Sequence, residues 1–209
     1  MFKKKFFFIV FEGVEGTGKS YQINKLYKNL KKKKISSIKT REPGGSRSAE
    51  LIRNLIFHKK SEKFDKLTDF YLMNASRNEH YQKKIIPCIK NRKILISDRF
   101  VDSTFAYQVI GKKINAKLNS INQKSILNNF KPNLTIVLKS NFKSIFQRLK
   151  KRGKKNKFDK LKLDFYKNAQ KTFLTLANKN KSKYIVFDSS LNNNDLEKKI
   201  LDLVLKRIK

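Results

Sequence analysis

The sequence predicts an α/β protein in which a parallel five-stranded sheet is flanked by helices. Short apolar runs alternate with longer amphipathic stretches, which is the strand and helix order of a parallel sheet. The 209 residues, 39% of them hydrophobic, suit a single domain over residues 1–209. Seven glycines, three prolines and the lack of a fixed-period repeat exclude collagen-like, coiled-coil and solenoid classes.

Five apolar runs have the length and composition of buried strands. In chain order they are residues 6–11, 35–39, 93–97, 134–138 and 184–187. The run 35–39 is the weakest of them because polar residues interrupt it. Together these runs provide the strands of the predicted sheet.

Amphipathic stretches occupy most of the chain between these runs. Helices are predicted over residues 20–32, 46–57, 64–90, 114–129, 140–152, 159–178 and 194–208. Pro87 should end or kink the third helix, because proline lacks an N–H group and clashes with the preceding turn. The polar segment 153–157, which begins with a glycine, predicts a mobile loop between two helices.

The chain is strongly basic, with 51 Lys and Arg against 16 Asp and Glu and a net charge of +35. Such a charge is typical of proteins that bind nucleic acid or anionic membranes. Nucleic-acid readers, however, use arginine forks, aromatic platforms and localised patches, whereas here lysines predominate and are spread through every segment. We therefore predict no selected nucleic-acid binding and interpret the charge as compositional drift. A nucleic-acid-binding protein remains the alternative, and a steep salt dependence of binding would indicate it.

The apolar run near the N-terminus is too short for a secretory signal, and no other run approaches the roughly 20 residues of a membrane span. Cys88 is the single cysteine, so an intramolecular disulfide is impossible and a reducing compartment is favoured. With only two histidines beside it, a zinc site is not expected. The sequence predicts a cytoplasmic protein without membrane contact.

A phosphate-binding loop follows the first predicted strand. The residues that match G-x-x-x-x-G-K-[ST] are Gly13, Val14, Glu15, Gly16, Thr17, Gly18, Lys19 and Ser20. The backbone of such a loop and the start of the following helix surround phosphate groups. Lys19 should reach the β and γ phosphates of ATP, and Ser20 should bind Mg²⁺. Asp98, at the carboxyl end of a predicted strand, is a second candidate magnesium ligand.

Four blocks of this chain resemble the thymidylate kinase family, and the resemblance covers nearly the whole length. They are residues 11–20, residues 40–45 (Thr-Arg-Glu-Pro-Gly-Gly), Arg77, and residues 98–108 (Asp-Arg-Phe-Val-Asp-Ser-Thr-Phe-Ala-Tyr-Gln). The resemblance implies a P-loop nucleoside monophosphate kinase fold with a small lid and a homodimer. It further implies ATP-dependent phosphorylation of dTMP to dTDP in deoxynucleotide biosynthesis.

The resemblance also implies the contacts to dTMP. Glu15 would face the deoxyribose 3′-hydroxyl, and Arg77 would bond a thymine carbonyl. Tyr107 would crowd the 2′ position of the sugar, while Arg41 and Arg99 would hold the acceptor phosphate. The remaining members of the implied dTMP site are Asp98, Ser103, and the base contacts Thr104 and Gln108.

Phosphoryl transfer to a monophosphate needs no general base, because the second pKa of the acceptor phosphate is near 6. The task is to position the two phosphates and neutralise their charge. The segment 14–17 has no Arg or Lys, so the positive charge must come from elsewhere. Arg148 and Arg152 lie four apart on one predicted helix face and open into a lid at about 148–159, as in bacterial members of the family. The predicted catalytic set is Glu15, Lys19, Arg41, Arg99, Arg148 and Arg152.

Some positions depart from the family pattern. Lys157 stands where the lid usually has an arginine, and Met73 stands where the family often has an aromatic or aliphatic residue. Asn133 and Lys139 replace the Asp residues that usually begin and end one strand. Two further alternatives stay open: a deoxynucleoside kinase of the same fold, and a chain that binds nucleotide without transferring phosphate.

Overall fold

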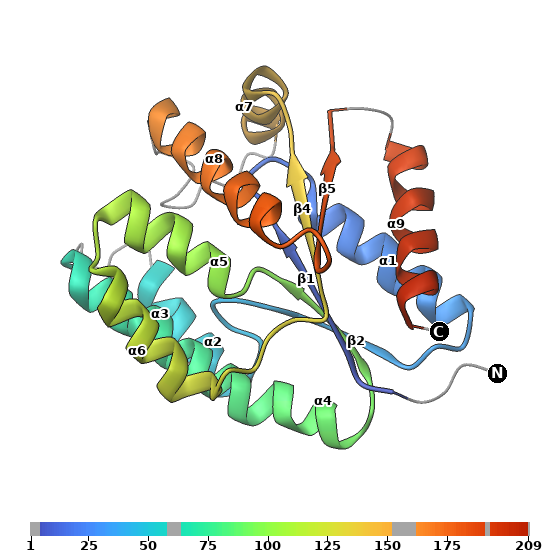
Figure 1. Ribbon diagram of the computed structural model, residues 1–209, viewed down its shortest axis with the longest axis horizontal. Coiled ribbons are helices and arrows are strands. Elements are labelled where there is room, and N and C mark those ends of the chain that lie inside the picture. The colour runs from blue at the N-terminus through green and yellow to red at the C-terminus, as the bar shows by residue number, and fades with distance from the viewer. Residues whose placement is uncertain (1–4, 58–63, 152–161, 191–192, 209) are drawn as a thin grey trace.

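The computed structural model describes residues 5–57, 64–151, 162–190 and 193–208 (Figure 1). Five parallel strands form one sheet in the order β2-β3-β1-β4-β5. The strands are β1 (Phe7–Glu12), β2 (Ser37–Arg41), β3 (Ile94–Asp98), β4 (Leu134–Lys139) and β5 (Tyr184–Asp188). The predicted parallel five-stranded sheet is thus confirmed, including the weak second strand.

Two helices cover one face of the sheet, α1 (Lys19–Lys32) and α9 (Asn193–Ile208). Alternate residues of β1, Ile9 and Phe11, are fully buried in this layer with Leu26 of α1. The period of two along a strand sends these side chains to one face and their neighbours to the other. In Figure 1 the two helices lie side by side next to the sheet.

The opposite face carries more helices, and two apolar clusters fill the space beneath them. Phe8 and Val10 of β1 belong to one of these clusters, and Val137 of β4 belongs to the other. The helices on this side are α2 (Arg47–Phe57), α3 (Lys66–His80), α4 (Ile86–Lys90), α6 (Ala116–Leu127), α7 (Phe142–Lys151) and α8 (Leu163–Lys179). The predicted helices therefore occur where amphipathic periodicity placed them.

The predicted helix 64–90 is interrupted rather than broken. A π-helical turn, η1 (Tyr81–Ile85), joins α3 to α4, and Pro87 lies in the first turn of α4. Proline is tolerated there because its missing N–H is one that a helix start leaves unpaired. Pro87 therefore does not end the predicted helix as expected, and a local widening of the helix precedes it instead.

One helix was not predicted. The segment after β3 forms α5 (Val101–Thr104) and continues as a π-helical turn, η2 (Phe105–Ile110). Residues 106–109 are all buried, so the segment lacks the polar stripe that reveals an amphipathic helix. This helix carries four of the predicted acceptor-site residues, Ser103, Thr104, Tyr107 and Gln108.

Arg152, Lys157 and the rest of the segment 152–161 lie outside the described residues, so the predicted lid is described only at 148–151. In the described part of the chain, no helix combines the length and the apolar character that crossing a bilayer requires.

Candidate active site

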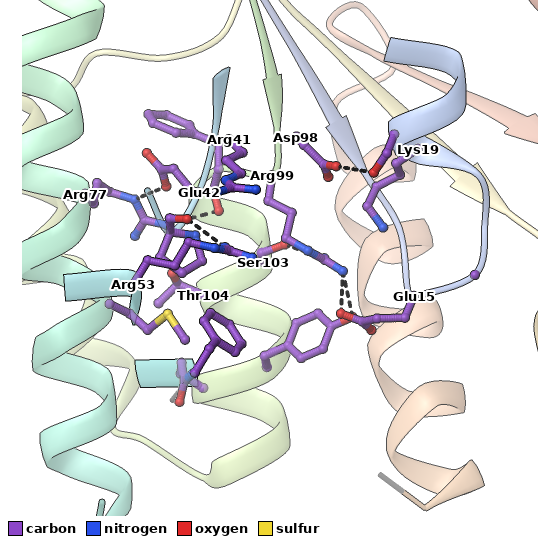
Figure 2. A pocket seen from close by; sticks show the side chains of 18 of the residues that line it. Glu15, Lys19, Arg41, Glu42, Arg53, Arg77, Asp98, Arg99, Ser103 and Thr104 are labelled. Atoms are coloured by element: carbon purple, nitrogen blue, oxygen red, sulfur yellow. Dashed lines mark hydrogen bonds and ion pairs between the residues drawn. The ribbon is translucent and has the colours of Figure 1, made fainter. Parts of the chain in front are cut away.

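The carboxyl ends of β1, β2 and β3 meet at one edge of the sheet, and a cavity of about 450 Å³ opens there (Figure 2). It is lined by the phosphate-binding loop, by residues 41–43, by α2 and α3, by the α5–η2 helix and by α7. Open parallel sheets bind ligands at this edge because the loops after the strands gather there. The four sequence blocks of the predicted site all reach this cavity.

The phosphate-binding loop depends on glycine where other parts of the chain come close. A Cβ at Gly13, whose φ is 137°, would overlap the Leu138 carbonyl oxygen of β4. A Cβ at Gly16 would lie 2.9 Å from the Ile145 carbonyl oxygen of α7. The loop is therefore packed between β4 and α7, in a conformation that larger residues cannot share.

Lys19 is buried in this loop, and its Nζ donates to the carbonyl oxygens of Gly13 (2.9 Å) and Val14 (3.0 Å). Burial, and next the positive charge of Arg99, lower the pKa of Lys19 to about 8. A triphosphate in the loop would supply the negative charge that favours the ammonium form.

Ser20 and Asp98, the two candidate magnesium ligands, lie together. The Ser20 hydroxyl donates to Asp98 Oδ2 over 2.8 Å, and both residues line the cavity. Hydroxyl and carboxylate oxygens suit Mg²⁺, which is typically held by one or two protein oxygens together with phosphates and water. The residues present therefore fit the ion.

Glu15, Arg99 and Tyr107 form a closed polar cluster beside the loop. Arg99 Nη2 donates to Glu15 Oε1 (2.7 Å), and the Tyr107 hydroxyl donates to Glu15 Oε2 (2.7 Å). Arg99 Nη1 donates to the Gly13 carbonyl (3.1 Å) and to the Ser103 hydroxyl (2.9 Å). Burial opposes ionisation of Glu15, but Arg99 and Lys19 outweigh it and hold the pKa of that carboxyl below its usual value. Glu15 is therefore a carboxylate that fixes both neighbours.

Arg77 extends from α3 into the other end of the cavity and is only 3% exposed. Its Nε donates to Glu42 Oε2 (2.7 Å), and its Nη2 donates to the Phe100 carbonyl (3.1 Å). His80 Nδ1 lies 2.9 Å from the other oxygen of Glu42, so both oxygens of this carboxyl group have a partner. Arg77 Nη1 has no hydrogen-bond partner among the described residues.

Gln108 of η2 is a second buried polar residue in this part of the cavity. Its side-chain oxygen Oε1 has no partner within the described part of the chain. Thr104, one helical turn earlier, is also buried against the cavity, and Met73 of α3 provides an apolar wall. A buried polar atom without a partner is costly, and on the wall of a cavity a ligand can supply the missing bond.

Two arginines near the end of β2 behave differently. Arg41, a predicted phosphate ligand, is half exposed and forms a double contact with Glu50, with Nη2–Oε2 at 2.7 Å. Arg53 of α2 was not predicted, yet it lines the cavity and donates to the Pro43 carbonyl (2.8 Å). Burial and neighbouring Arg41 lower the pKa of Arg53, as expected where cations gather. No motif in the sequence marks Arg53, so its place in the cavity could not be predicted.

Arg148 lies at the rim of the phosphate-binding loop. It donates to the carbonyl oxygens of Gly16 (3.2 Å) and Ser189 (2.7 Å), and so joins α7 to the loop and to the end of β5. The predicted partner Arg152 lies outside the described residues.

At two positions that depart from the family pattern, Asn133 and Lys139, the structure shows which contacts the residues present make. The Asn133 side-chain oxygen accepts the N–H of Phe8 (2.7 Å), which ties the start of β4 to β1. Lys139 lies 3.7 Å from Asp188 of β5, so a carboxylate is still present at that end of the sheet.

Fold and site together define a P-loop phosphotransferase with a nucleoside monophosphate kinase fold, in which a second polar pocket lies beside the phosphate-binding loop. The model of the thymidylate kinase family matches residues 11–200. A thymidylate kinase of Sulfurihydrogenibium sp. (strain YO3AOP1) is 34% identical over 201 residues, which is 96% of this chain and 98% of the relative. One of Aster yellows witches'-broom phytoplasma (strain AYWB) is 39% identical over 205 residues, 97% and 96% of the two chains.

Among solved structures, the thymidylate kinase of Ehrlichia chaffeensis superposes with a TM-score of 0.78 at 27% identity, over 96% of this chain and 99% of that one. The chain belongs to the thymidylate kinase family.

Proposed function

We propose that this protein transfers the γ-phosphoryl group of ATP to dTMP, forming dTDP for deoxynucleotide biosynthesis. The observation that carries the proposal is a buried donor and a buried acceptor in one pocket, Arg77 Nη1 and Gln108 Oε1, neither bonded within the described residues. Thymine presents a carbonyl next to an N–H, which matches a donor and an acceptor. Cytosine presents an amino group next to an unprotonated nitrogen, which reverses both roles.

The cations between this pocket and the loop support a phosphorylated acceptor. Arg53 and Arg99 both line the cavity, and their guanidinium groups suit the oxygens of a phosphate. Arg99 is already paired with Glu15, but a deoxynucleoside would bring no phosphate to either guanidinium group. The arrangement therefore favours a nucleoside monophosphate over the deoxynucleoside alternative.

In the proposed reaction an oxygen of the dianionic acceptor phosphate attacks the γ-phosphorus, and the bond to the β–γ bridging oxygen breaks to release ADP. Lys19 and the loop amides would hold the β and γ phosphates, and Arg99 would hold the acceptor phosphate in line. Glu15 would accept a hydrogen bond from the 3′-hydroxyl of the sugar, because Arg99 and Tyr107 already fix the orientation of the Glu15 carboxylate. Arg148 and Arg152 stay predicted contributors to γ-phosphate neutralisation.

Ser20 and Asp98 would hold Mg²⁺. When bound, the ion neutralises charge on the phosphate oxygens of ATP.

The experiment that tests the proposal is an ADP-release assay with ATP, Mg²⁺ and each of dTMP, dUMP, dCMP, AMP and GMP. We expect turnover with dTMP, weaker turnover with dUMP, only slow but measurable turnover with dCMP, and none with AMP or GMP. ATP hydrolysis that is independent of the acceptor would contradict the proposal, and stimulation of that hydrolysis by DNA would favour the nucleic-acid alternative.

We further propose a homodimer that pairs through α2, α3 and α6. Exposed apolar side chains gather on these helices, at Leu51, Leu55, Leu67, Tyr71 and Ile121. Within α2 and within α3 the two residues lie four apart, hence on one helix face, and Leu51 is 67% exposed. Sedimentation should give twice the 24.6 kDa chain mass, and Leu51→Glu should shift the protein toward monomer while Leu163→Glu on α8 should not. A monomeric wild type would refute this pairing.

A cytoplasmic location also stays a prediction.

A further inference from the structure

Glu12, the last residue of β1, is completely buried and does not line the cavity. Its Oε1 accepts the backbone N–H of Phe100 (2.8 Å) and of Ser103 (3.3 Å). Its Oε2 is 2.6 Å from the Ser103 hydroxyl. One carboxyl group therefore takes up two backbone N–H groups and a side chain at the start of the α5–η2 helix.

These bonds link Glu12 to the residues that would face dTMP. The Ser103 hydroxyl, which contacts Glu12, also accepts a hydrogen bond from Arg99 Nη1 at 2.9 Å. The helix that begins at this point continues through Thr104 and carries Gln108, both of them buried against the cavity. A change at Glu12 therefore reaches the acceptor side through two routes, the Ser103 side chain and the helix start.

The local chain does not hold Arg99 by itself. Its φ is 74°, a left-handed conformation that is unfavourable for a residue with a side chain, so tertiary contacts must maintain it. Glu12 provides such contacts on both sides of the bend, since it binds the N–H of the next residue and, through Ser103, the guanidinium group itself.

The charge state of Glu12 matters because two phosphate groups would bind nearby. Burial, reinforced by Asp102, raises the pKa of Glu12 to about 8, although Arg99 acts in the opposite direction. A neutral carboxyl can still accept both N–H groups on one oxygen and donate from the other to Ser103. It adds no negative charge beneath an anion-binding site, which a carboxylate would do.

We propose that Glu12 is a positioning residue for the phosphoryl acceptor, and that it acts through hydrogen bonds to Ser103 and Phe100, rather than through charge, to place Arg99 and the α5–η2 helix. This inference rests on the proposed function, in which Arg99 holds the acceptor phosphate.

The test compares Glu12→Ala with Glu12→Gln in steady-state kinetics, with dTMP and ATP varied separately. Glu12→Ala should lower kcat/KM for dTMP by about tenfold or more, as expected for lost hydrogen bonds to a buried group, with the KM for ATP within about twofold of wild type. Glu12→Gln should keep kcat/KM for dTMP within about threefold, because the amide oxygen accepts the two N–H groups and the amide NH₂ donates to Ser103. Equal losses in the two variants, or an equal rise in both KM values, would overturn the proposal.

Ser103→Ala covers the case in which Glu12→Ala does not fold, since it keeps the backbone bonds to Glu12. It should lower kcat/KM for dTMP and leave the KM for ATP within about twofold of wild type, because the contact from Glu12 to Arg99 runs through the Ser103 hydroxyl. An unchanged kcat/KM for dTMP would overturn the link between the two residues. Glu197→Gln is the control, because Glu197 of α9 pairs with Lys25 (3.0 Å) and Asn29 of α1, does not line the cavity and should leave kcat/KM for dTMP unchanged. Absence of dTMP turnover in the wild type would instead refute the proposed function, so the two failures are distinguishable.

Discussion

Replacement of Arg77 by lysine separates the recognition of the base from the stability of the fold. Arg77 Nε pairs with Glu42, which is 4% exposed in its side chain, while Nη1 remains available to the cavity. A lysine can supply the charge that Glu42 needs, but its single nitrogen cannot also reach a ligand. Alanine would leave Glu42 with His80 alone, and an uncompensated buried charge costs about 3–5 kcal/mol. Lysine is therefore the informative change.

The expected effect on dTMP follows from the lost bond. A hydrogen bond from a charged donor contributes roughly 1.5–3 kcal/mol, which corresponds to roughly 10- to 150-fold in kcat/KM. For dCMP, whose amino group would oppose the Arg77 donor, little is lost. The ratio of kcat/KM for dTMP over dCMP should therefore fall by nearly the whole factor, while the KM for ATP stays unchanged.

The assay is ADP release with dTMP and dCMP as acceptors, together with urea unfolding of each variant. Arg47→Lys is the matched control, because Arg47 is exposed on α2 and does not line the cavity. If Arg77→Lys lowers turnover of dTMP and dCMP by the same factor, or changes only the KM for ATP, the assignment of Arg77 to the base is wrong.

Three further predictions concern stability, the loop and the charge. Between pH 4.5, the ordinary pKa of a glutamate, and about pH 8, Glu12 is protonated in the folded protein but ionised in the unfolded chain. The contribution of this difference to the free energy of unfolding is therefore complete below pH 4.5 and is lost as the pH rises through 8. Urea unfolding should show it as a fall on the order of 5 kcal/mol over that window, and Glu12→Gln should flatten the slope. Gly13→Ala should destabilise the fold by about 2 kcal/mol or more, because the added methyl group overlaps the Leu138 carbonyl. The same change should abolish the rise in melting temperature that ATP causes. Melting curves with and without ATP check both results. Titration of DNA of several sequences at rising salt should show weak binding without a preferred site, and a tight preferred site would restore the nucleic-acid interpretation.

Local patterns in the sequence were sufficient for much of the fold. The runs that became β1, β3 and β4 are apolar because both faces of a parallel sheet are covered there, and this leaves a continuous signal in a short window. The run that became β5, an edge strand, is apolar although its residues are only partly buried. The phosphate-binding loop is equally local, since a strand, a glycine-rich turn and a helix start follow one another within residues 7–20.

The resemblance named most acceptor-site residues, but their partners could not be read from spacing. Arg41 forms an ion pair with Glu50, and Arg53 lines the cavity although no motif marks it. Such choices depend on which charged groups α2 brings near residues 41–43, and the sequence pattern of one helix does not contain that information.

Local signals in the sequence were enough for the strands, most helices, the phosphate-binding loop and the family pattern, because each depends on neighbours within a few turns or on a recognisable motif. Tertiary structure alone decided the α5–η2 helix, the cap that Glu12 places on it, and the unpaired atoms of Arg77 and Gln108. In each case burial and hydrogen bonding join groups that are far apart in the chain, such as Glu12 and Ser103, which are separated by 91 positions.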